Sequence, residues 1–175
     1  VRPLAALAAL SAGACQAIRA AARPVLLNDI HSRLNATLVA SVASPRSTEA
    51  LAALVKAAAR NGQAVSIAGG RHAMGGQQFG THAAHLDMSQ MNEVLDYDAQ
   101  RGIVRVEAGI GWPKLLEYLA RHRPAGHPGW AIAQKQTGAD ELSLGGALSA
   151  NAHGRGLRHR PMVQDVEAFT LVNAE

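Results

Sequence analysis

The most informative segment of the chain is Ser66-Ile67-Ala68-Gly69-Gly70-Arg71-His72-Ala73-Met74-Gly75-Gly76-Gln77. Four glycines flank an Arg-His pair in it, directly after the apolar run 64–68, which is typical of a strand. Glycine lets the backbone approach a ligand closely and adopt positive φ, which we expect at Gly70, so successive N–H groups can converge on an anion. The stretch therefore predicts a loop that holds a phosphorylated cofactor, although glycine-rich loops are also plain surface connections in many proteins.

Two familiar nucleotide-binding motifs are excluded by the residues of the chain. Gly70 and Gly75 have the GxxxxG spacing of a Walker loop, but Gly76-Gln77 stands where that motif requires Lys followed by Ser or Thr. The GxGxxG fingerprint of a Rossmann fold occurs nowhere in the chain. The loop therefore predicts a phosphate-binding fold of another kind.

A second glycine-rich block follows at Leu142-Ser143-Leu144-Gly145-Gly146-Ala147-Leu148-Ser149-Ala150-Asn151-Ala152-His153-Gly154-Arg155-Gly156. Small residues alternate with apolar ones through most of this block, and a His-Gly pair lies near its end. Two ordered glycine-rich blocks are a much more specific signal than either block alone. A protein family that this chain resembles should therefore contain both blocks in the same order.

Taken together, the two blocks resemble the FAD-binding domain of the vanillyl-alcohol oxidase/p-cresol methylhydroxylase flavoprotein family, and within it the sugar-alcohol and aldonolactone oxidases. In those relatives a Gly-x-x-His core wraps the FAD pyrophosphate, and a later Ser-x-Gly-Gly…His-Gly segment lies along the flavin. The resemblance runs from about Asn28 to the last residue, with both motifs in the expected order. It implies an α+β fold, namely an FAD-binding domain of the p-cresol methylhydroxylase type that is incomplete at its C-terminus.

The resemblance implies FAD contacts in both blocks. In the first block the implied cofactor-binding residues are Ile67, Ala68, Gly69, Gly70, Arg71, His72, Ala73 and Met74. In the second block they are Ser143, Leu144, Gly145, Gly146, Asn151, Ala152, His153 and Gly154. The first block would contribute mainly backbone contacts. The start of the second block would lie beside the diphosphate or ribityl chain, and its end, from Asn151 to Gly154, beside the flavin ring.

His72 is the sharpest single candidate for cofactor chemistry. In many relatives the matching histidine bonds covalently to the 8α carbon of the flavin, which needs a neutral imidazole nitrogen beside an activated methyl group. The alternative is that His72 only hydrogen-bonds a phosphate or the loop backbone. Arg71 could pair with a phosphate or be a solvated charge, and His153 could contact the flavin or be a buried histidine. No catalytic residue is assigned, because in the family these residues come largely from a further C-terminal part.

The resemblance also implies an activity. In full-length form the protein would be an oxidoreductase that oxidises an alcohol or sugar-like hydroxyl substrate by hydride transfer to FAD. Its partners would be FAD and a small-molecule alcohol or polyol, and we expect this segment alone to be inactive. The alternative is a truncated, non-catalytic flavin-binding remnant or an interaction protein, because the chain stops at Glu175 directly after an expected strand, 166–173.

Composition bounds the class of protein. The 175 residues suffice for one compact domain, and 48% hydrophobic with 17% charged residues is typical of a folded globular chain. The net charge of +4 would suit nucleic acid, but the arginines are scattered and lack an aromatic stacking platform, so we expect no nucleic-acid partner. Cys15 is the only cysteine, and the eight histidines form no HExxH motif, so we expect neither an intrachain disulfide nor a metal site.

Residues 1–27 differ from the remainder, 28–175, which we assign to the N-terminal part of the FAD-binding domain. Arg2, the apolar run 4–10 and the small residues before Cys15 form either a signal peptide or an N-terminal helix. The apolar run is too short to span a membrane. A signal peptide would place the protein in the periplasm or outside the cell, and otherwise we expect a cytoplasmic protein.

Hydrophobic patterns predict the elements around the two blocks. We expect strands at 37–42, 64–68, 85–88, 103–108 and 166–173. We also expect a helix that Ser47 caps and Asn61-Gly62 ends, and a second helix that begins at Trp112-Pro113. The buried face of the first helix should carry Leu51, Leu54, Val55 and Ala58, and that of the second should carry Leu115, Leu116 and Leu119.

Overall fold

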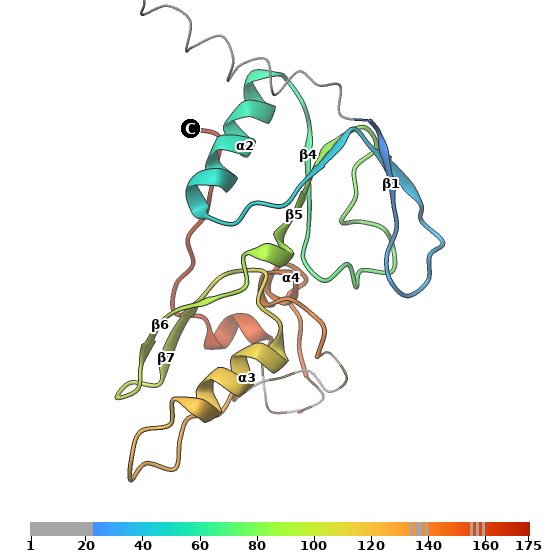
Figure 1. The fold of residues 1–175 in the computed structure, drawn as a ribbon. Helices are drawn as coiled ribbons and strands as arrows, with labels where there is room; N and C mark the ends of the chain where they lie inside the picture. Colours follow the sequence, from blue (N-terminus) through green and yellow to red (C-terminus); the bar gives the residue numbers. More distant parts are fainter. Residues whose placement is uncertain are drawn as a thin grey trace, which may run out of the picture.

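A computed structural model describes residues 23–133, 135, 138, 140–154, 156, 158 and 160–175 of the chain. The segment expected to be a signal peptide or N-terminal helix lies mostly outside these residues, but its last three residues form strand β1 (Val25–Leu27). In Figure 1 the described chain has two parts, one around helix α2 and a parallel sheet, the other around helices α3 and α4. Helices and strands are mixed along the chain, which confirms the predicted α+β class.

The first part contains two small sheets that follow one another along the chain. β1 pairs antiparallel with β2 (Thr37–Val39), and β3 (Ser41–Ala43) then joins a parallel sheet with the order β3-β5-β4. We expected one strand over 37–42, but the chain changes partner at Ala40, whose N–H donates to the Ala83 carbonyl at 2.9 Å. A single apolar run therefore supplies two strands in two sheets.

Strands β4 (Val65–Ala68) and β5 (Ala84–Asp87) lie where the sequence predicts them, and α2 (Thr48–Arg60) connects β3 to β4. Ser47 caps α2 as predicted, because its side chain accepts the Ala50 N–H at 3.1 Å. The predicted face of the helix is turned inward, with Leu51 and Ala58 buried and Leu54 and Val55 half-buried. The core beneath the helix consists of Leu51, Leu86, Met88 and Met91.

The second part packs a hairpin and two helices around a core of its own. Its elements are β6 (Val94–Asp98), β7 (Ile103–Val106), α3 (Trp112–Arg121) and α4 (Leu144–Ser149), with the 3-10 helices η2 (Met88–Gln90) before it and η3 (Met162–Asp165) after it. We did not expect β6, which pairs antiparallel with β7, or α4. The core consists of Ile110, Trp112, Leu115, Leu119, Ala147, Ala152 and Met162, whereas Leu116, which we expected among them, is 38% exposed.

The expected strand at 166–173 is absent, and this prediction was wrong. The segment follows η3 as irregular chain, and among the described residues no strand pairs with it. A strand needs a neighbour that takes its backbone hydrogen bonds, so an apolar pattern alone is not sufficient. Val172 packs against the core beneath α2, while Phe169 and Leu171 are 71% and 77% exposed. Figure 1 accordingly shows the C-terminal segment running alongside α2.

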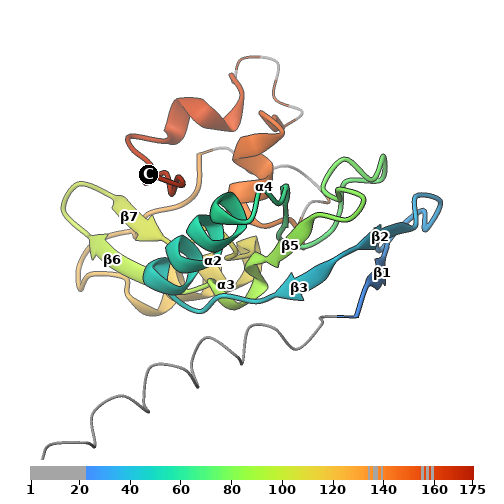
Figure 2. The same ribbon diagram turned by 90° about the horizontal axis from the view of Figure 1, so that it is seen from above.

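The arrangement leaves the β1–β2 hairpin and the β6–β7 hairpin on opposite sides of the molecule. In Figure 2 they extend to either side of α2, and α4 lies between them. The two glycine-rich blocks meet at Gly69 and Ser143, and the first block continues from there to the loop of the β1–β2 hairpin.

Candidate functional site

The first loop, residues 69–76, begins where β4 ends. Its positive-φ positions are Arg71, at 56°, and Gly76, at 72°. Gly70 does not have positive φ, so our reason for a glycine at that position was wrong. A left-handed conformation costs a non-glycine residue roughly 1–2 kcal/mol, so the surroundings of Arg71 must hold the loop in this shape.

The hairpin loop, residues 28–36 between β1 and β2, provides that support. The Ile30 N–H donates to the Arg71 carbonyl at 3.2 Å. The Met74 carbonyl accepts from the Ser32 hydroxyl at 3.3 Å and from the Asn35 side-chain amide at 2.7 Å. All these bonds end on carbonyl oxygens of the first loop.

The N–H groups of the first loop are left available by this arrangement. Within the described part of the chain, no hydrogen bond has a backbone N–H of residues 70–75 as its donor. Consecutive N–H groups without acceptors form a concavity that binds anions. The hairpin loop thus binds the carbonyl oxygens of the first loop, and the N–H groups of the first loop are free to bind a ligand. The exposed side chain of Arg71 adds a positive charge beside them.

Asp29 organises the hairpin loop. One of its carboxylate oxygens accepts the backbone N–H of His31 at 2.9 Å and that of Ser32 at 2.6 Å, and the other accepts the Ser32 hydroxyl at 2.7 Å. Burial would raise the pKa of Asp29, but these bonds and one from the Arg33 N–H lower the pKa from 3.8 to about 2. Asp29 is therefore ionised at neutral pH and keeps the loop folded around its carboxylate.

The second block uses its N–H groups differently. Ser143 caps α4, and its hydroxyl accepts the Gly146 N–H at 3.3 Å. The Leu144 N–H donates to the Ile110 carbonyl at 2.9 Å, and the Gly145 N–H donates to the Ala108 carbonyl at 2.8 Å. The first turn of α4 is therefore satisfied by the protein itself, and its N–H groups are not free for an anion.

The two blocks touch, and glycine is what allows it. A Cβ on Gly69 would overlap the side chain of Ser143, and a Cβ on Gly70 would lie 2.5 Å from the Glu141 carbonyl oxygen. A Cβ on Gly145 would lie 2.8 Å from the Cβ of Ala108. Since real Cβ atoms do not approach other atoms so closely, the packing leaves no room for a side chain at these three positions.

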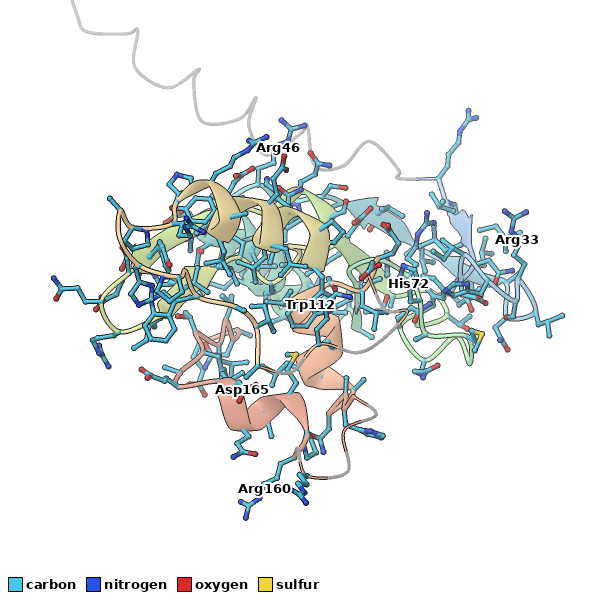
Figure 3. The ribbon with its side chains drawn as sticks, turned by 90° about the horizontal axis from the view of Figure 1, so that it is seen from below. Arg33, Arg46, His72, Trp112, Arg160 and Asp165 are labelled. Atoms are coloured by element: carbon cyan, nitrogen blue, oxygen red, sulfur yellow. The ribbon has the colours of Figure 1, made fainter. Side chains whose placement is uncertain are left out.

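A cleft of about 380 Å³ opens beside this contact. It is lined by His31, His72, Gly138, Asp140, Glu141 and Leu142. Nε2 of His31 lies 2.7 Å from Nδ1 of His72, and the two ring centroids are 4.7 Å apart. Figure 3 shows His72 between the hairpin that carries Arg33 and the helical part that contains Trp112.

His72 is neutral at physiological pH. Burial lowers the pKa of His72 below its usual value, and the charge of His31 lowers it further. Glu141 opposes both effects through its charge and through a hydrogen bond with its backbone. A neutral imidazole keeps one nitrogen lone pair, which is the form that metal ions, protons and electrophiles require.

The structure brings together only part of the predicted site. Ile67 and Ala68 end β4, and Gly69 at the start of the first loop packs on Ser143, whereas the Met74 carbonyl is bound by the hairpin loop. The end of the second block, Asn151 to Gly154, lies beyond the far end of α4, and among the described residues no hydrogen bond or ring contact joins it to the first loop. His153 is exposed, so the alternative of a buried histidine is wrong.

The hairpin loop is the component of the site that we did not predict. Its sequence, Asn28-Asp29-Ile30-His31-Ser32, contains a signal for a tight local turn, since an Asp side chain commonly binds backbone N–H groups a few residues on. That signal predicts a turn but not its contact with a loop about forty residues later. Glu141, whose carbonyl approaches Gly70, was missed for the same reason.

Neither a metal centre nor a membrane-spanning helix is found in the described residues. No three His, Cys, Asp or Glu side chains of this part of the chain come together as metal ligands. No helix in the same part is both long and apolar enough to cross a membrane.

Comparison with known proteins agrees with this geometry. The family described as FAD binding domain matches residues 39–175. The chain is 28% identical over 131 residues to L-gulonolactone oxidase from Bos taurus, which covers 74% of this chain and 28% of the relative. It is 28% identical over 134 residues to L-gulono-1,4-lactone dehydrogenase from Mycobacterium tuberculosis, with 77% and 29% covered. The chain thus spans less than a third of the length of these relatives.

Solved structures share the fold. An alkyldihydroxyacetonephosphate synthase superposes with a TM-score of 0.59 at 22% identity, over 67% of this chain and 22% of that one. An aclacinomycin oxidoreductase superposes with a TM-score of 0.55 at 21% identity, over 68% and 22%. The match over residues 39–175 and the shared fold confirm the resemblance: the chain belongs to the FAD-binding domain family of the vanillyl-alcohol oxidase/p-cresol methylhydroxylase flavoproteins, and its cofactor is FAD.

Proposed function

We propose that the first loop binds the diphosphate of FAD. The observation that supports this is the polarity of the loop: its carbonyls at Arg71 and Met74 are bound by the hairpin loop, while the N–H groups of residues 70–75 have no acceptor among the described residues. Neutral donors without acceptors are what a diphosphate needs, and the exposed Arg71 side chain lies beside them. The residues present therefore fit the cofactor.

We assign the second block to the ribityl chain and the flavin ring. Because the N–H groups at the start of α4 are used by Ile110, Ala108 and Ser143, the block would contact FAD through its side-chain and Cα surface. The proposed contacts are Ser143, Leu144, Gly145, Gly146, Asn151, Ala152, His153 and Gly154. The direct packing of Gly69 on Ser143 supports one continuous binding surface formed by both blocks.

His72 is the proposed point of covalent attachment. It lies in the first loop, borders the cleft, and is neutral, so it carries a nitrogen lone pair. His31, Asp140 and Glu141 line the same cleft. They would enclose the edge of the cofactor and limit its contact with water.

The whole protein would be an oxidoreductase of hydroxyl-bearing substrates. When bound, FAD supplies a hydride acceptor for the carbon that carries the oxidised hydroxyl. The named relatives, L-gulonolactone oxidase and L-gulono-1,4-lactone dehydrogenase, favour a sugar lactone or polyol as substrate. In that protein this segment would hold and orient the cofactor.

Flavin binding tests the proposal first. The native-length protein should quench the fluorescence of added FAD and should bind FAD more tightly than riboflavin, which lacks the diphosphate and the adenosine joined to it. We expect the diphosphate to contribute at least about a hundredfold in affinity, since charge-assisted hydrogen bonds are each worth roughly 1.5–3 kcal/mol. A native-length protein that never binds FAD would contradict the proposal, and equal affinity for FAD and riboflavin would contradict the role of the first loop.

The covalent bond and the activity need separate tests. After denaturation the flavin should stay with the wild-type protein and be released from His72→Ala, which keeps every backbone N–H of the first loop. Complete release from the wild type would disprove the attachment while leaving diphosphate binding intact. Anaerobic bleaching of the flavin by sugar lactones or polyols would support the substrate class, and reduction by neither would contradict it.

A further inference from the structure

The β1–β2 hairpin exposes several large apolar side chains. Leu26 and Leu38 are cross-strand partners, so they share one face of the hairpin, and both are exposed. On the other face Val39 is fully buried. In the hairpin loop Ile30 is exposed, and Leu34 is 85% exposed. Single exposed leucines are ordinary, but four large apolar side chains on one short hairpin indicate an interaction surface.

The first loop lies beside the hairpin and adds to this surface. Met74 has an exposed side chain, and its carbonyl is bound by Ser32 and Asn35 of the hairpin loop. Figures 1 and 2 both show the hairpin and the chain that follows β4 side by side at one end of the molecule. Residues 23–39 and 69–83, here called the hairpin end, therefore form one exposed region.

The hairpin end carries positive charge with almost no negative charge to oppose it. The chain has 13 Asp and Glu residues, and Asp29 is the only one of them in the hairpin end. Asp29 is buried, and its carboxylate accepts backbone N–H groups of its own loop. The three basic residues, Arg23, Arg33 and Arg71, are exposed and form no ion pair among the described residues. Figure 3 shows Arg33 at the outer edge of the molecule, beyond His72. Since Arg71 is assigned to the diphosphate, Arg23 and Arg33 are left for another partner.

The β6–β7 hairpin, on the opposite side of the molecule, differs in its charge. Its exposed leucine, Leu95, is followed by Asp96, which is also exposed, and Asp98 lies in the same strand. Carboxylates beside an apolar side chain disfavour contact with an anionic surface. Exposed apolar groups beside unopposed arginines are therefore a property of the hairpin end and not of the β6–β7 hairpin.

Aliphatic side chains flanked by arginines fit the interface of an anionic lipid bilayer. The apolar groups enter the boundary between headgroups and acyl chains, and the arginines bind lipid phosphates. Nucleic acid fits less well, because single strands stack on aromatic side chains, and the only Phe, Tyr or Trp of the hairpin end, Phe79, is half-buried beside His85. Protein interfaces are also enriched in aromatic residues at their centre, which this surface lacks.

We propose that the hairpin end is a docking surface for an anionic membrane, with Leu34 inserted at the interface and Arg23 and Arg33 bound to lipid phosphates. This contact does not require FAD, so the inference goes beyond the proposed function and does not depend on it. It would bring the first loop close to the membrane, because the hairpin loop and the first loop are joined at the Met74 carbonyl.

Co-sedimentation of the native-length protein with lipid vesicles tests the proposal. Vesicles of phosphatidylcholine and phosphatidylglycerol in equal parts should bind the wild type at least about tenfold more strongly than vesicles of phosphatidylcholine alone, since each arginine near an anionic surface contributes roughly a factor of five. Binding should weaken as the salt concentration rises. Absence of binding to the mixed vesicles, or equal binding to both kinds, would overturn the proposal.

Leu34→Ser and Leu95→Ser are a matched pair, because each replaces an exposed leucine of a hairpin. Leu34→Ser should weaken binding to the mixed vesicles about tenfold through loss of an inserted side chain, whereas Leu95→Ser should bind like the wild type. Thermal unfolding should be unchanged in both variants, since both side chains are exposed. Equal binding by the two variants would show that the contact lies elsewhere, and would overturn the proposal.

Arg33→Lys and Arg33→Glu test the charge. The lysine variant keeps the charge and should bind the mixed vesicles within about threefold of the wild type. The glutamate variant should bind about thirtyfold more weakly, because the charge at this position changes by two. Equal binding by these two variants would contradict the role of Arg33 in docking.

A protein occupant would give a different pattern. If a second copy of the chain or another segment of the native-length protein covered the hairpin end, Leu34→Ser would change the oligomeric mass or the stability, and the wild type would not bind vesicles. That result would overturn the proposal. FAD binding is measured on the same preparation: a wild type that binds FAD but not vesicles disproves the docking surface and leaves the proposed function intact, and the reverse result disproves the proposed function alone.

Discussion

In the first loop the backbone N–H groups of residues 70–75 have no acceptor among the described residues, whereas in the second block the N–H groups of residues 144–147 all have one. Both segments are rich in glycine, and both resemble cofactor motifs. Glycine content therefore does not by itself identify an anion site. What matters is whether the protein has already used the donors. In this protein the N–H groups of the first loop are open to a ligand, whereas those at the start of the second block are used in packing.

The largest effect should follow from a methyl group in the packed block. Gly145→Ala would place a Cβ 2.8 Å from that of Ala108 and 2.9 Å from its carbonyl oxygen, so backbone must move against backbone. We expect a loss of about 2–3 kcal/mol in the free energy of unfolding, typical of overpacking in a tight interior. Denaturant unfolding of the two proteins measures it.

Gly146→Ala is the matched control for that prediction. Its Cβ would meet only the Ser143 hydroxyl, at 2.9 Å, and the residue is exposed. Since alanine is also a better helix former than glycine, the net change should stay within about 1 kcal/mol. Equal destabilisation by both substitutions would show that the close approach to Ala108 does not determine stability.

Asp29→Asn should weaken the support of the first loop. The carboxylate has its pKa lowered from 3.8 to about 2, so its stabilisation is complete above pH 3.8 and is lost as the pH falls through about 2. The variant should be less stable than the wild type at neutral pH, and the difference should shrink between about pH 4 and pH 2. Denaturant unfolding across this pH range measures it, and a difference that is constant with pH would contradict the assigned role.

Arg71→Gly should separate the binding function of the first loop from its stability. Removing the guanidinium should weaken FAD binding about tenfold, the lower end of what one charge-assisted contact contributes, while every N–H of the loop remains. Glycine should also relieve the left-handed backbone at 56° and leave stability unchanged or higher by up to about 1 kcal/mol.

Arg33→Gly is the control for this change. Arg33 has the same charge and a similar positive φ of 54°, but it lies in the hairpin loop. It should show the same small effect on stability with no loss of FAD affinity. Equal loss of affinity in both variants would point to net charge and not to a contact made by Arg71.

The smallest effect should come from the cap of α4. Ser143→Ala removes the acceptor of the Gly146 N–H and should cost about 1 kcal/mol of stability, as loss of a helix cap usually does. Affinity for FAD should change less than about threefold if the hydroxyl serves the helix and not the diphosphate. A tenfold loss of affinity for FAD with unchanged stability would show that the Ser143 hydroxyl binds the cofactor, and would contradict the packing role given to the second block. Calorimetric titration with FAD measures the affinity, and thermal unfolding measures the stability.

Local sequence signals predicted the elements that depend on local interactions. Ser47 and Leu51 define α2, Trp112-Pro113 begin α3, and an apolar run before Gly69 forms β4, because capping and periodicity act within a few residues. The strand expected at 166–173 failed because a strand depends on a partner elsewhere in the chain. β6 and the change of partner at Ala40 were missed for the same reason.

The sequence was sufficient to identify the family and the cofactor, since two ordered glycine-rich blocks indicate an FAD-binding domain. Which backbone N–H groups of these blocks are free could be read only from the folded chain, because it depends on the carbonyls of Ala108 and Ile110 and on the hairpin loop. It likewise brought His31 to His72, 41 positions along the chain. Hydrogen-bond acceptors and neighbouring rings come from distant segments, and no local pattern records which distant segment will fold against a loop.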